Sequence, residues 1–334
     1  MTLLSDLSRL IEDQLDKNGI SYDRSMPLDR LVARYFEMNV RQVQPVPRQV
    51  HFSDRIHASL GELARRGKDD PSAQNAWGAV FRLRQLLVAG ANVNGFLSTR
   101  IRRATVRDGL LWHYGMHHFH LASEMDADGF VKRSDHLLFA MVAREDAYFV
   151  DVRPHPPKGS IEWSSQELLH IVHSNWPHLI EANVLRGVRG TQLADGEVHE
   201  LRRKNANYAI DIDGKAIAPL GGGMAGDGSS VLCTIFASKL LRDLRYHQEL
   251  LNNDEVHEAV ARNLRAQGFD AGPTLEFELV FLENLSPSPE LLAALTAEKC
   301  VSRDLRAAGL AVIEKRSGSP IVIHSTSCLE GQSE

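Results

Sequence analysis

The sequence lacks the features that mark a disulfide-stabilised, secreted or membrane-spanning protein. Its three cysteines, Cys233, Cys300 and Cys328, lie far apart and form no C-x-x-C pair, so neither a disulfide framework nor a cysteine-based zinc site is indicated. No stretch approaches the roughly 18 consecutive apolar residues of a membrane helix, and residues 1–15 lack the basic start and apolar run of a signal peptide. We therefore expect a soluble, cytoplasmic protein without a membrane partner.

An excess of positive charge is missing too. The formal net charge is −5 at pH 7, which argues against a protein that coats nucleic acid non-specifically, so any contact with phosphates must be local. The fractions of hydrophobic residues (43%) and charged residues (24%) are ordinary for a globular protein. With 334 residues the chain is long enough for two or three units, each with its own core.

The spacing of apolar residues predicts three domains of an α+β protein. Residues 1–110 repeat apolar side chains every three or four positions, which predicts an N-terminal helical bundle with Ser53 as one helix cap. Residues 111–205 change to a period of two, which predicts an antiparallel β-meander and a packed helix. Residues 206–334 predict a C-terminal α/β unit. The meander strands are expected at 117–121, 136–143 and 147–153, and the helix at 163–180. The C-terminal unit is expected to contain a hairpin at 208–219 with an Asp213-Gly214 type I′ turn, helices at 232–251 and 255–267, and strands at 275–281 and 321–324.

Histidines are concentrated in one part of the chain. Nine of the 15 lie within residues 113–178. His118 and His120 are two apart on an expected strand, which directs both side chains to one face. By the same alternation, one face of a later strand is expected to carry Phe149, Asp151, Arg153 and His155. If the two polar faces coincide, imidazoles, a carboxylate and a guanidinium converge.

Such a polar face predicts acid–base chemistry on a phosphate diester. A neutral histidine removes a proton, a protonated one supports the leaving group, and Arg153 stabilises the developing charge. The candidate catalytic residues are therefore His118, His120, Asp151, Arg153 and His155. Because strand histidines are commonly hydrogen-bonded or surface residues, a structural role for the set stays open. His136 is expected to be scaffold, and His170 and His173 to face solvent.

A metal site is a second interpretation of the same histidines. His118-x-His120 directs two imidazoles toward one ion, and Glu124 follows four residues later. This pattern resembles the first half of a cupin motif over residues 115–129. On this interpretation His118, His120 and Glu124 bind a metal ion, whereas the acid–base interpretation needs no cofactor.

One strand of the expected meander ends in the run Tyr148-Phe149-Val150-Asp151-Val152-Arg153-Pro154-His155. The segment 117–155 resembles the β-meander of the RelE and barnase-like ribonuclease fold, found in metal-independent RNA-cleaving toxins. In that family one strand commonly ends in an apolar-Arg/Gly-His run. The resemblance implies that Arg153 and His155 lie in a cleavage site, with His118 and His120 beside them. The chain departs from the family in being long and slightly acidic, and two prolines follow His155 where the family often has a basic residue and then an aromatic one.

Arginine groups and a glycine-rich loop are candidates for phosphate binding. Two basic groups flank the expected polar face and would form a track that suits RNA, with solvated surface as the alternative. The group before the meander is Arg100, Arg102, Arg103 and Arg107, and the group after its helix is Arg186, Arg189, Arg202, Arg203 and Lys204. The loop 221–228 leads from an expected strand into a helix, where backbone amides can bind an anion. It lacks the Gly-Lys-Ser/Thr ending of a P-loop, and a plain connector is the alternative. The candidate phosphate-binding residues are Arg102, Arg103, Arg107, Arg186, Arg189, Gly222 and Gly223.

Three functions stay open from the sequence. The first is a metal-independent endoribonuclease, toxin-like or defence-related, whose partners are RNA and an antitoxin or another regulatory protein. The second is a non-catalytic nucleic-acid-binding or regulatory protein in which the histidines are structural. The third is a metal-dependent hydrolase or oxygenase built on the His-x-His pair.

Overall fold

The computed structural model describes residues 2–132, 134–266, 268–269, 275–281 and 308–317. The chain forms two compact units: unit 1 comprises Met1–Tyr35 with Thr234–Glu334, and unit 2 comprises Phe36–Cys233. These boundaries differ from the three expected domains because the first 110 residues do not fold separately. A strand and two helices from that region belong to the same unit as the meander.

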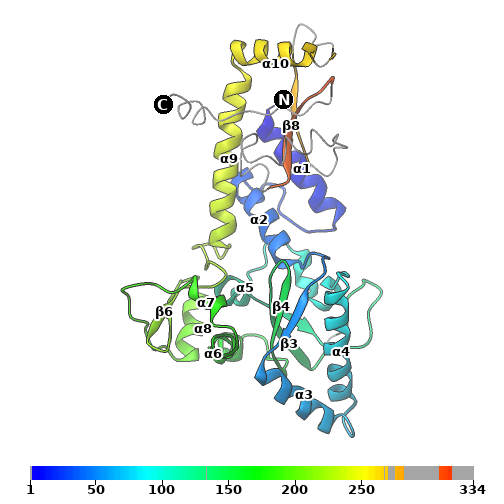
Figure 1. Cartoon of the computed structure of the whole chain (residues 1–334), viewed down its shortest axis with the longest axis vertical. Coiled ribbons are helices and arrows are strands. Elements are labelled where there is room, and N and C mark those ends of the chain that lie inside the picture. The colour runs from blue at the N-terminus through cyan, green and yellow to red at the C-terminus, as the bar shows by residue number, and fades with distance from the viewer. Residues whose placement is uncertain (1, 133, 267, 270–274, 282–307, 318–334) are drawn as a thin grey trace. The chain divides into compact units, whose positions relative to one another are not determined.

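The protein has the mixed α+β class that the sequence predicts, with helices and small sheets (Figure 1). The main sheet of unit 2 has the order β1-β4-β3-β2. Its strands are β1 (Gln49–Phe52), β2 (Met116–His120), β3 (His136–Val142) and β4 (Asp146–Pro154). The pairing of β2, β3 and β4 is antiparallel, which confirms the predicted meander. β1 was not predicted, and it pairs in parallel with β4.

Helices cover both faces of this sheet (Figure 1). α3 (Asp54–Arg66) and α4 (Pro71–Val88) pack on one face, against Phe119, Leu138 and Phe149. The side chain of Ser53 accepts a hydrogen bond from the Ile56 amide and so caps α3, as predicted. α6 (Glu167–Asn175) packs with Leu137, Phe139 and Val150 in the core of the other face. The meander is therefore the middle layer of unit 2.

The helix expected at 163–180 is wrong as a single element. The structure has η3 (Ile161–Ser164), α6 and α7 (His178–Glu181) in its place. Pro177 explains the last break: a proline disfavours helical geometry in the residue before it, and Trp176 has φ −142° and ψ 66°.

The rest of unit 2 consists of short elements around the meander. The predicted hairpin forms from β5 (Ile210–Ile212) and β6 (Lys215–Ile217). Its turn residues Asp213 and Gly214 have φ of 52° and 76°, which confirms the type I′ turn. The remaining elements are η1 (Asn94–Phe96), η2 (Thr99–Arg102), α5 (Gly109–Tyr114) and α8 (Asp195–Arg203).

Unit 1 combines helices with a two-stranded sheet. It contains α1 (Leu3–Lys17), α10 (Asp254–Ala266), β7 (Phe277–Phe281) and the unpredicted β8 (Leu310–Glu314). α2 (Leu28–Arg41) and α9 (Val231–Leu251) have residues in both units. The Asp6 carboxylate of α1 accepts a hydrogen bond from the Leu279 amide of β7, so α1 packs on this sheet. The strand expected at 321–324 lies outside the described residues.

Among the described residues, no helix combines the length and apolarity needed to cross a membrane.

Candidate functional site

A cavity of about 630 Å³ opens in unit 2 beside the edge strand β2. Its walls come from the loop between η1 and α5, from β2, from the segment between β4 and η3, and from the end of α8. His118 and His155, two of the predicted catalytic residues, line it. Six basic side chains line it as well: Arg41, Arg100, Arg107, Lys158, Arg202 and Arg203.

Four aromatic side chains, here called the ring cluster, form one side of the site: His118, His120, His155 and Trp163. The ring centroids of His118 and Trp163 are 5.2 Å apart, and those of His155 and Trp163 are 5.8 Å apart. His120 lies 6.0 Å from His118 and 5.4 Å from His155. The structure therefore brings three of the five predicted catalytic residues together. Two of them, His118 and His155, contact the indole ring and line the cavity, whereas His120 contacts these two histidines and is not among the residues that line the cavity.

Local structure explains how the ring cluster is held. His118 and His120 alternate with Phe119 on β2, and Phe119 is buried in the core on the opposite face of the sheet. His155 follows β4, and its backbone amide donates to the carbonyl of Asp135 at 2.7 Å. The indole N–H of Trp163 donates to the carbonyl of Pro157 at 3.1 Å. The strand β2 thus positions His118 and His120, a backbone hydrogen bond positions His155, and the carbonyl of Pro157 holds the ring of Trp163.

Burial sets the protonation of two histidines that line the cavity. Loss of solvent lowers the pKa of His118; the nearby His155 lowers it further, and Asp108 acts in the opposite direction. Burial also lowers the pKa of His117 to about 4. Both side chains are therefore neutral at pH 7, the state in which an imidazole can accept a proton.

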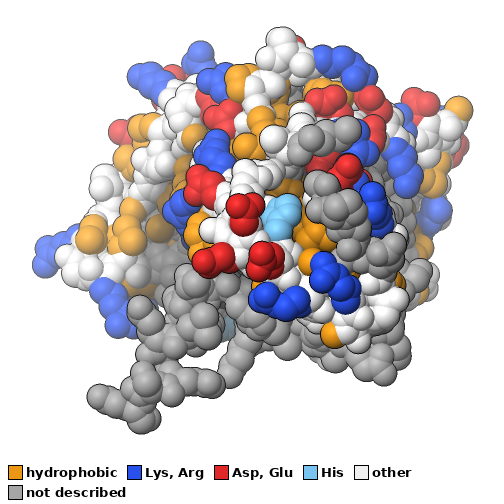
Figure 2. Space-filling view, turned by 90° about the horizontal axis from the view of Figure 1, so that it is seen from above, with side chains coloured by type: hydrophobic (Ala, Val, Ile, Leu, Met, Phe, Trp, Pro, Cys, Tyr) orange, Lys and Arg blue, Asp and Glu red, His pale blue; other side chains and the backbone are white. Residues whose placement is uncertain are grey.

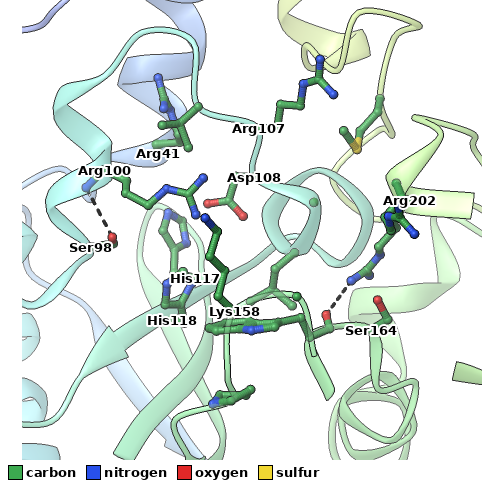
Figure 3. A pocket seen from close by; sticks show the side chains of 18 of the residues that line it. Arg41, Ser98, Arg100, Arg107, Asp108, His117, His118, Lys158, Ser164 and Arg202 are labelled. Atoms are coloured by element: carbon green, nitrogen blue, oxygen red, sulfur yellow. Dashed lines mark hydrogen bonds between the residues drawn. The ribbon is translucent and has the colours of Figure 1, made fainter. Parts of the chain in front are cut away.

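The cavity is strongly basic. Arg100, Arg107 and Lys158 form no ion pair with a described carboxylate, whereas Arg203 pairs with Glu200 at 2.9 Å. Asp108 is the sole acidic residue among the described residues that line the cavity. Its carboxylate is already engaged, because it accepts a hydrogen bond from the Leu111 amide at 3.0 Å as the cap of α5. Figure 3 shows Arg100 and Lys158 close to His117 and His118, beside Asp108.

Asp151 and Arg153, the other two predicted catalytic residues, do not line the cavity. Asp151 is 1% exposed and accepts hydrogen bonds from Ser59 at 2.7 Å and from Arg153 Nε at 2.8 Å. Arg153 also donates to Ser165 at 3.1 Å and to Glu167 at 2.9 Å. These contacts tie α3, β4 and α6 together, which is a structural role.

A β-bulge changes the expected alternation on β4 between Phe149 and Asp151. Phe139 of β3 pairs with Asp151, but the next residue, Ala140, pairs with Phe149, so Val150 is an extra residue in β4. Phe149 packs in the core under α3 and α4, whereas Arg153 bonds to the α6 side. The expectation of one shared face is therefore wrong for Phe149. Asp151 and Arg153 lie beyond the bulge and pair with Phe139 and Leu137, which are also the β3 partners of His118 and His120.

Of the five arginines chosen as candidate phosphate-binding residues, Arg107 alone lines the cavity within the described part of the chain; Arg100, Arg202 and Arg203, from the same two basic groups, line it as well. Arg102 donates to the carbonyl of Asp128 at 2.9 Å and lies over the Phe130 ring. The side chains of Arg103, Arg186 and Arg189 are exposed elsewhere. An arginine contributes to a phosphate site only where the fold directs its side chain toward that site. Closeness to the site in the sequence does not determine this direction.

The glycine-rich loop does not present free amides to an anion at the two predicted positions. The Gly222 amide donates to the carbonyl of Pro219 at 2.9 Å, and the Gly223 amide donates to that of Trp112 at 2.8 Å. Both have positive φ, of 82° and 86°, and a Cβ on Gly223 would lie 2.3 Å from the side chain of Asn207. Glycine is required at these positions for the backbone to pack closely.

The metal interpretation is not supported by the placement of its ligands. Glu124 forms an ion pair with Lys132 at 2.5 Å, its side chain is 69% exposed, and it is not among the residues that line the cavity. In the described part of the chain, no three histidine, cysteine, aspartate or glutamate side chains are grouped so that they could hold a metal ion.

Several residues of the site were not predicted. Arg41 and Lys158 come from two distant segments, and Trp163 was expected only to open a helix. The proximity of Lys158 and Trp163 to His155 in the sequence was a usable signal, but Arg41 carries none. On the face shown in Figure 2, basic side chains are dispersed among acidic and apolar ones.

Comparison with family models, with curated proteins and with solved structures gave no match for this chain.

Proposed function

We propose that the protein is a metal-independent endoribonuclease whose acid–base pair is His118 and His155. The observation that carries this proposal is the contact of both imidazoles with the Trp163 ring, in a cavity whose free charges are cationic. Two imidazoles within reach of one phosphate provide a base and an acid. Arg100 and Lys158 supply the positive charge that a pentacoordinate phosphate requires.

The reaction follows from these roles. Neutral His118 removes the proton of a ribose 2′-hydroxyl, and the oxygen attacks the adjacent phosphorus. A bond forms between O2′ and phosphorus while the bond from phosphorus to O5′ breaks, and protonated His155 donates its proton to the leaving O5′. The products are a 2′,3′-cyclic phosphate and a 5′-hydroxyl. Arg100, Arg107 and Lys158 stabilise the negative charge on the non-bridging oxygens, and the indole of Trp163 offers a surface for base stacking.

The biological role that goes with this activity is toxin-like or defence-related cleavage of cytoplasmic RNA, with a regulatory protein such as an antitoxin as second partner. A non-catalytic nucleic-acid-binding protein would use the same cations. A measurement of RNA cleavage therefore distinguishes the ribonuclease from the non-catalytic nucleic-acid-binding protein.

Cleavage of a fluorescent single-stranded RNA in EDTA tests the proposal. We expect wild-type protein to cut it, and His118→Asn and His155→Asn each to reduce the rate by about 10²–10⁴-fold, the usual contribution of an acid or base. His170→Asn is the matched control, because His170 is exposed on α6 outside the cavity. Binding without turnover in the wild type, or unchanged rates in both site variants, contradicts the proposal.

A further inference from the structure

Arg202 carries a buried positive charge next to the cavity. The residue is 9% exposed, it lies at the end of α8 and it lines the cavity. Its Nε donates to the hydroxyl of Tyr208 at 2.8 Å, its Nη1 donates to the carbonyl of Trp163 at 2.6 Å, and its guanidinium lies 4.0 Å over the ring of Tyr114. All of these partners are neutral.

No described carboxylate pairs with this guanidinium, and its Nη2 has no hydrogen-bond partner among the described residues. A buried charge without a counter-ion is costly, so proteins normally pair it. Asp195 acts electrostatically on the same two tyrosines, but its carboxylate accepts hydrogen bonds from Gln166 and it is not among the residues that line the cavity. His199 lines the cavity there, with its Nδ1 3.5 Å from the hydroxyl of Ser164. Among the described residues, the guanidinium of Arg202 therefore has space for an anion at Nη2 and no anion that fills it.

This cationic centre is separate from the one at the ring cluster. Figure 3 shows His118, Arg100 and Lys158 on one side of the cavity and Arg202 with Ser164 on the other. Trp163 lies between them, since its ring contacts His118 and its carbonyl accepts from Arg202. A ligand that spans the cavity thus meets positive charge at two places. The volume, about 630 Å³, falls within the range of roughly 300–1,000 Å³ for pockets that enclose a small ligand.

We propose that Arg202 and His199 bind a terminal phosphate of the RNA, one nucleotide away from the phosphodiester at the ring cluster. The burial of Arg202 favours a terminal group, because a strand that continued past it would need an exit at a buried side chain. A phosphate monoester carries close to two negative charges at pH 7 and so matches a guanidinium and an imidazole better than a diester does. The inference rests on the proposed function for its ligand class, RNA, but not on turnover.

Binding of dinucleotides to wild-type protein tests the inference. The probes are 2′-deoxy dinucleotides, which lack the attacking hydroxyl, with a 5′-phosphate, with a 3′-phosphate or with neither, measured by titration calorimetry. We expect one of the two phosphorylated forms to bind at least about tenfold more tightly than the unphosphorylated form, as for a charge-assisted pair. Whichever phosphorylated dinucleotide binds more tightly shows whether the site takes a 5′-terminal or a 3′-terminal phosphate. Equal affinity of all three forms would overturn the inference.

Variants assign the gain to the two residues. Arg202→Gln and His199→Gln should each reduce the advantage of the terminal phosphate, and Arg189→Gln, an exposed arginine outside the cavity, should keep it. If Arg202→Gln fails to fold, the binding of the three dinucleotides to His199→Gln and to wild-type protein still tests the inference. A phosphate advantage that persists in folded variants at both positions also overturns the assignment. Tight binding of the phosphorylated dinucleotide without any RNA cleavage would refute the ribonuclease and support the subsite, whereas cleavage without a phosphate preference would do the reverse.

Discussion

His113 illustrates how burial determines the chemistry of a single side chain. It is 1% exposed, its ring stacks on Tyr208 at 5.0 Å, and its Nδ1 lies 3.1 Å from the carbonyl of Gly109. Burial, with a smaller effect from Arg202, lowers its pKa to about 4. Since His113 does not line the cavity, its titration affects stability and not the proposed reaction.

The sign of that effect follows from proton linkage. Between pH of about 6.5, the pKa of an unfolded histidine, and about 4, the unfolded chain binds a proton that the folded His113 does not. The free energy of unfolding is therefore retained above pH 6.5 and falls on acidification through this window, by on the order of 3 kcal/mol for His113. Urea unfolding between pH 7 and 4 should show a shallower fall in His113→Asn. His170→Asn, at an exposed position, should behave as wild type; an unchanged slope in His113→Asn would contradict the assignment.

The glycine-rich loop before α9 has a function other than the predicted one. Gly228 has φ +83°, and a Cβ built on it would lie 2.6 Å from both Cδ and Nε of Arg107. The missing side chain therefore makes room for Arg107, one of the cations of the cavity. The loop therefore affects the site by leaving space for the Arg107 side chain, and not through its own backbone amides.

Gly228→Ala should displace Arg107 and weaken the affinity for the single-stranded RNA substrate by about tenfold, the magnitude of one lost hydrogen bond to a charged group. Gly187→Ala is the matched control, because Gly187 has φ +75° and nothing within 4 Å of its Cβ position. Both substitutions carry the strain of a positive φ, about 1 kcal/mol in unfolding experiments, but only the first reaches Arg107. Equal affinities in the two variants would show that Arg107 is not held by this contact.

The β-bulge in β4 has a comparable influence at the level of a whole strand. Asp151 and Arg153 follow the inserted Val150 and pair with Phe139 and Leu137 of β3. A regular strand would have placed Phe149 on the same face as these two residues. The inserted residue therefore leaves Phe149 in the core under α3 and α4 and separates it from Arg153, which bonds to the α6 side.

The charge of the whole chain limits how it can bind RNA. With a net charge of −5, attraction comes from the cavity and not from the surface as a whole. If Arg100, Arg107 and Lys158 each neutralise one phosphate, the logarithm of the affinity for single-stranded RNA should fall with the logarithm of the salt concentration with a slope of about −2. Titrations at several salt concentrations measure this slope. Lys158→Gln should make it shallower by about 0.7, and a wild-type slope steeper than about −5 would require a far larger basic surface.

The sequence by itself determined the features that depend on near neighbours along the chain. The strands of the meander follow from the period of two, the start of α3 from the cap at Ser53, and the hairpin from Asp213-Gly214. The shared face of His118 and His120 follows from the alternation on β2. Each of these is decided within a few residues, so the local sequence contains the information.

Only the tertiary structure decided which side chains share the cavity. Arg41, Arg100, Lys158 and Arg202 meet there from positions up to 161 residues apart, a separation that no local pattern encodes. The tertiary structure also added β1 to the meander, which moved the domain boundary, and it engaged Asp151 and Arg153 in contacts with α3 and α6 outside the cavity. These outcomes depend on packing between distant segments, because burial and close contact, not sequence proximity, fix where a charge or a ring is directed.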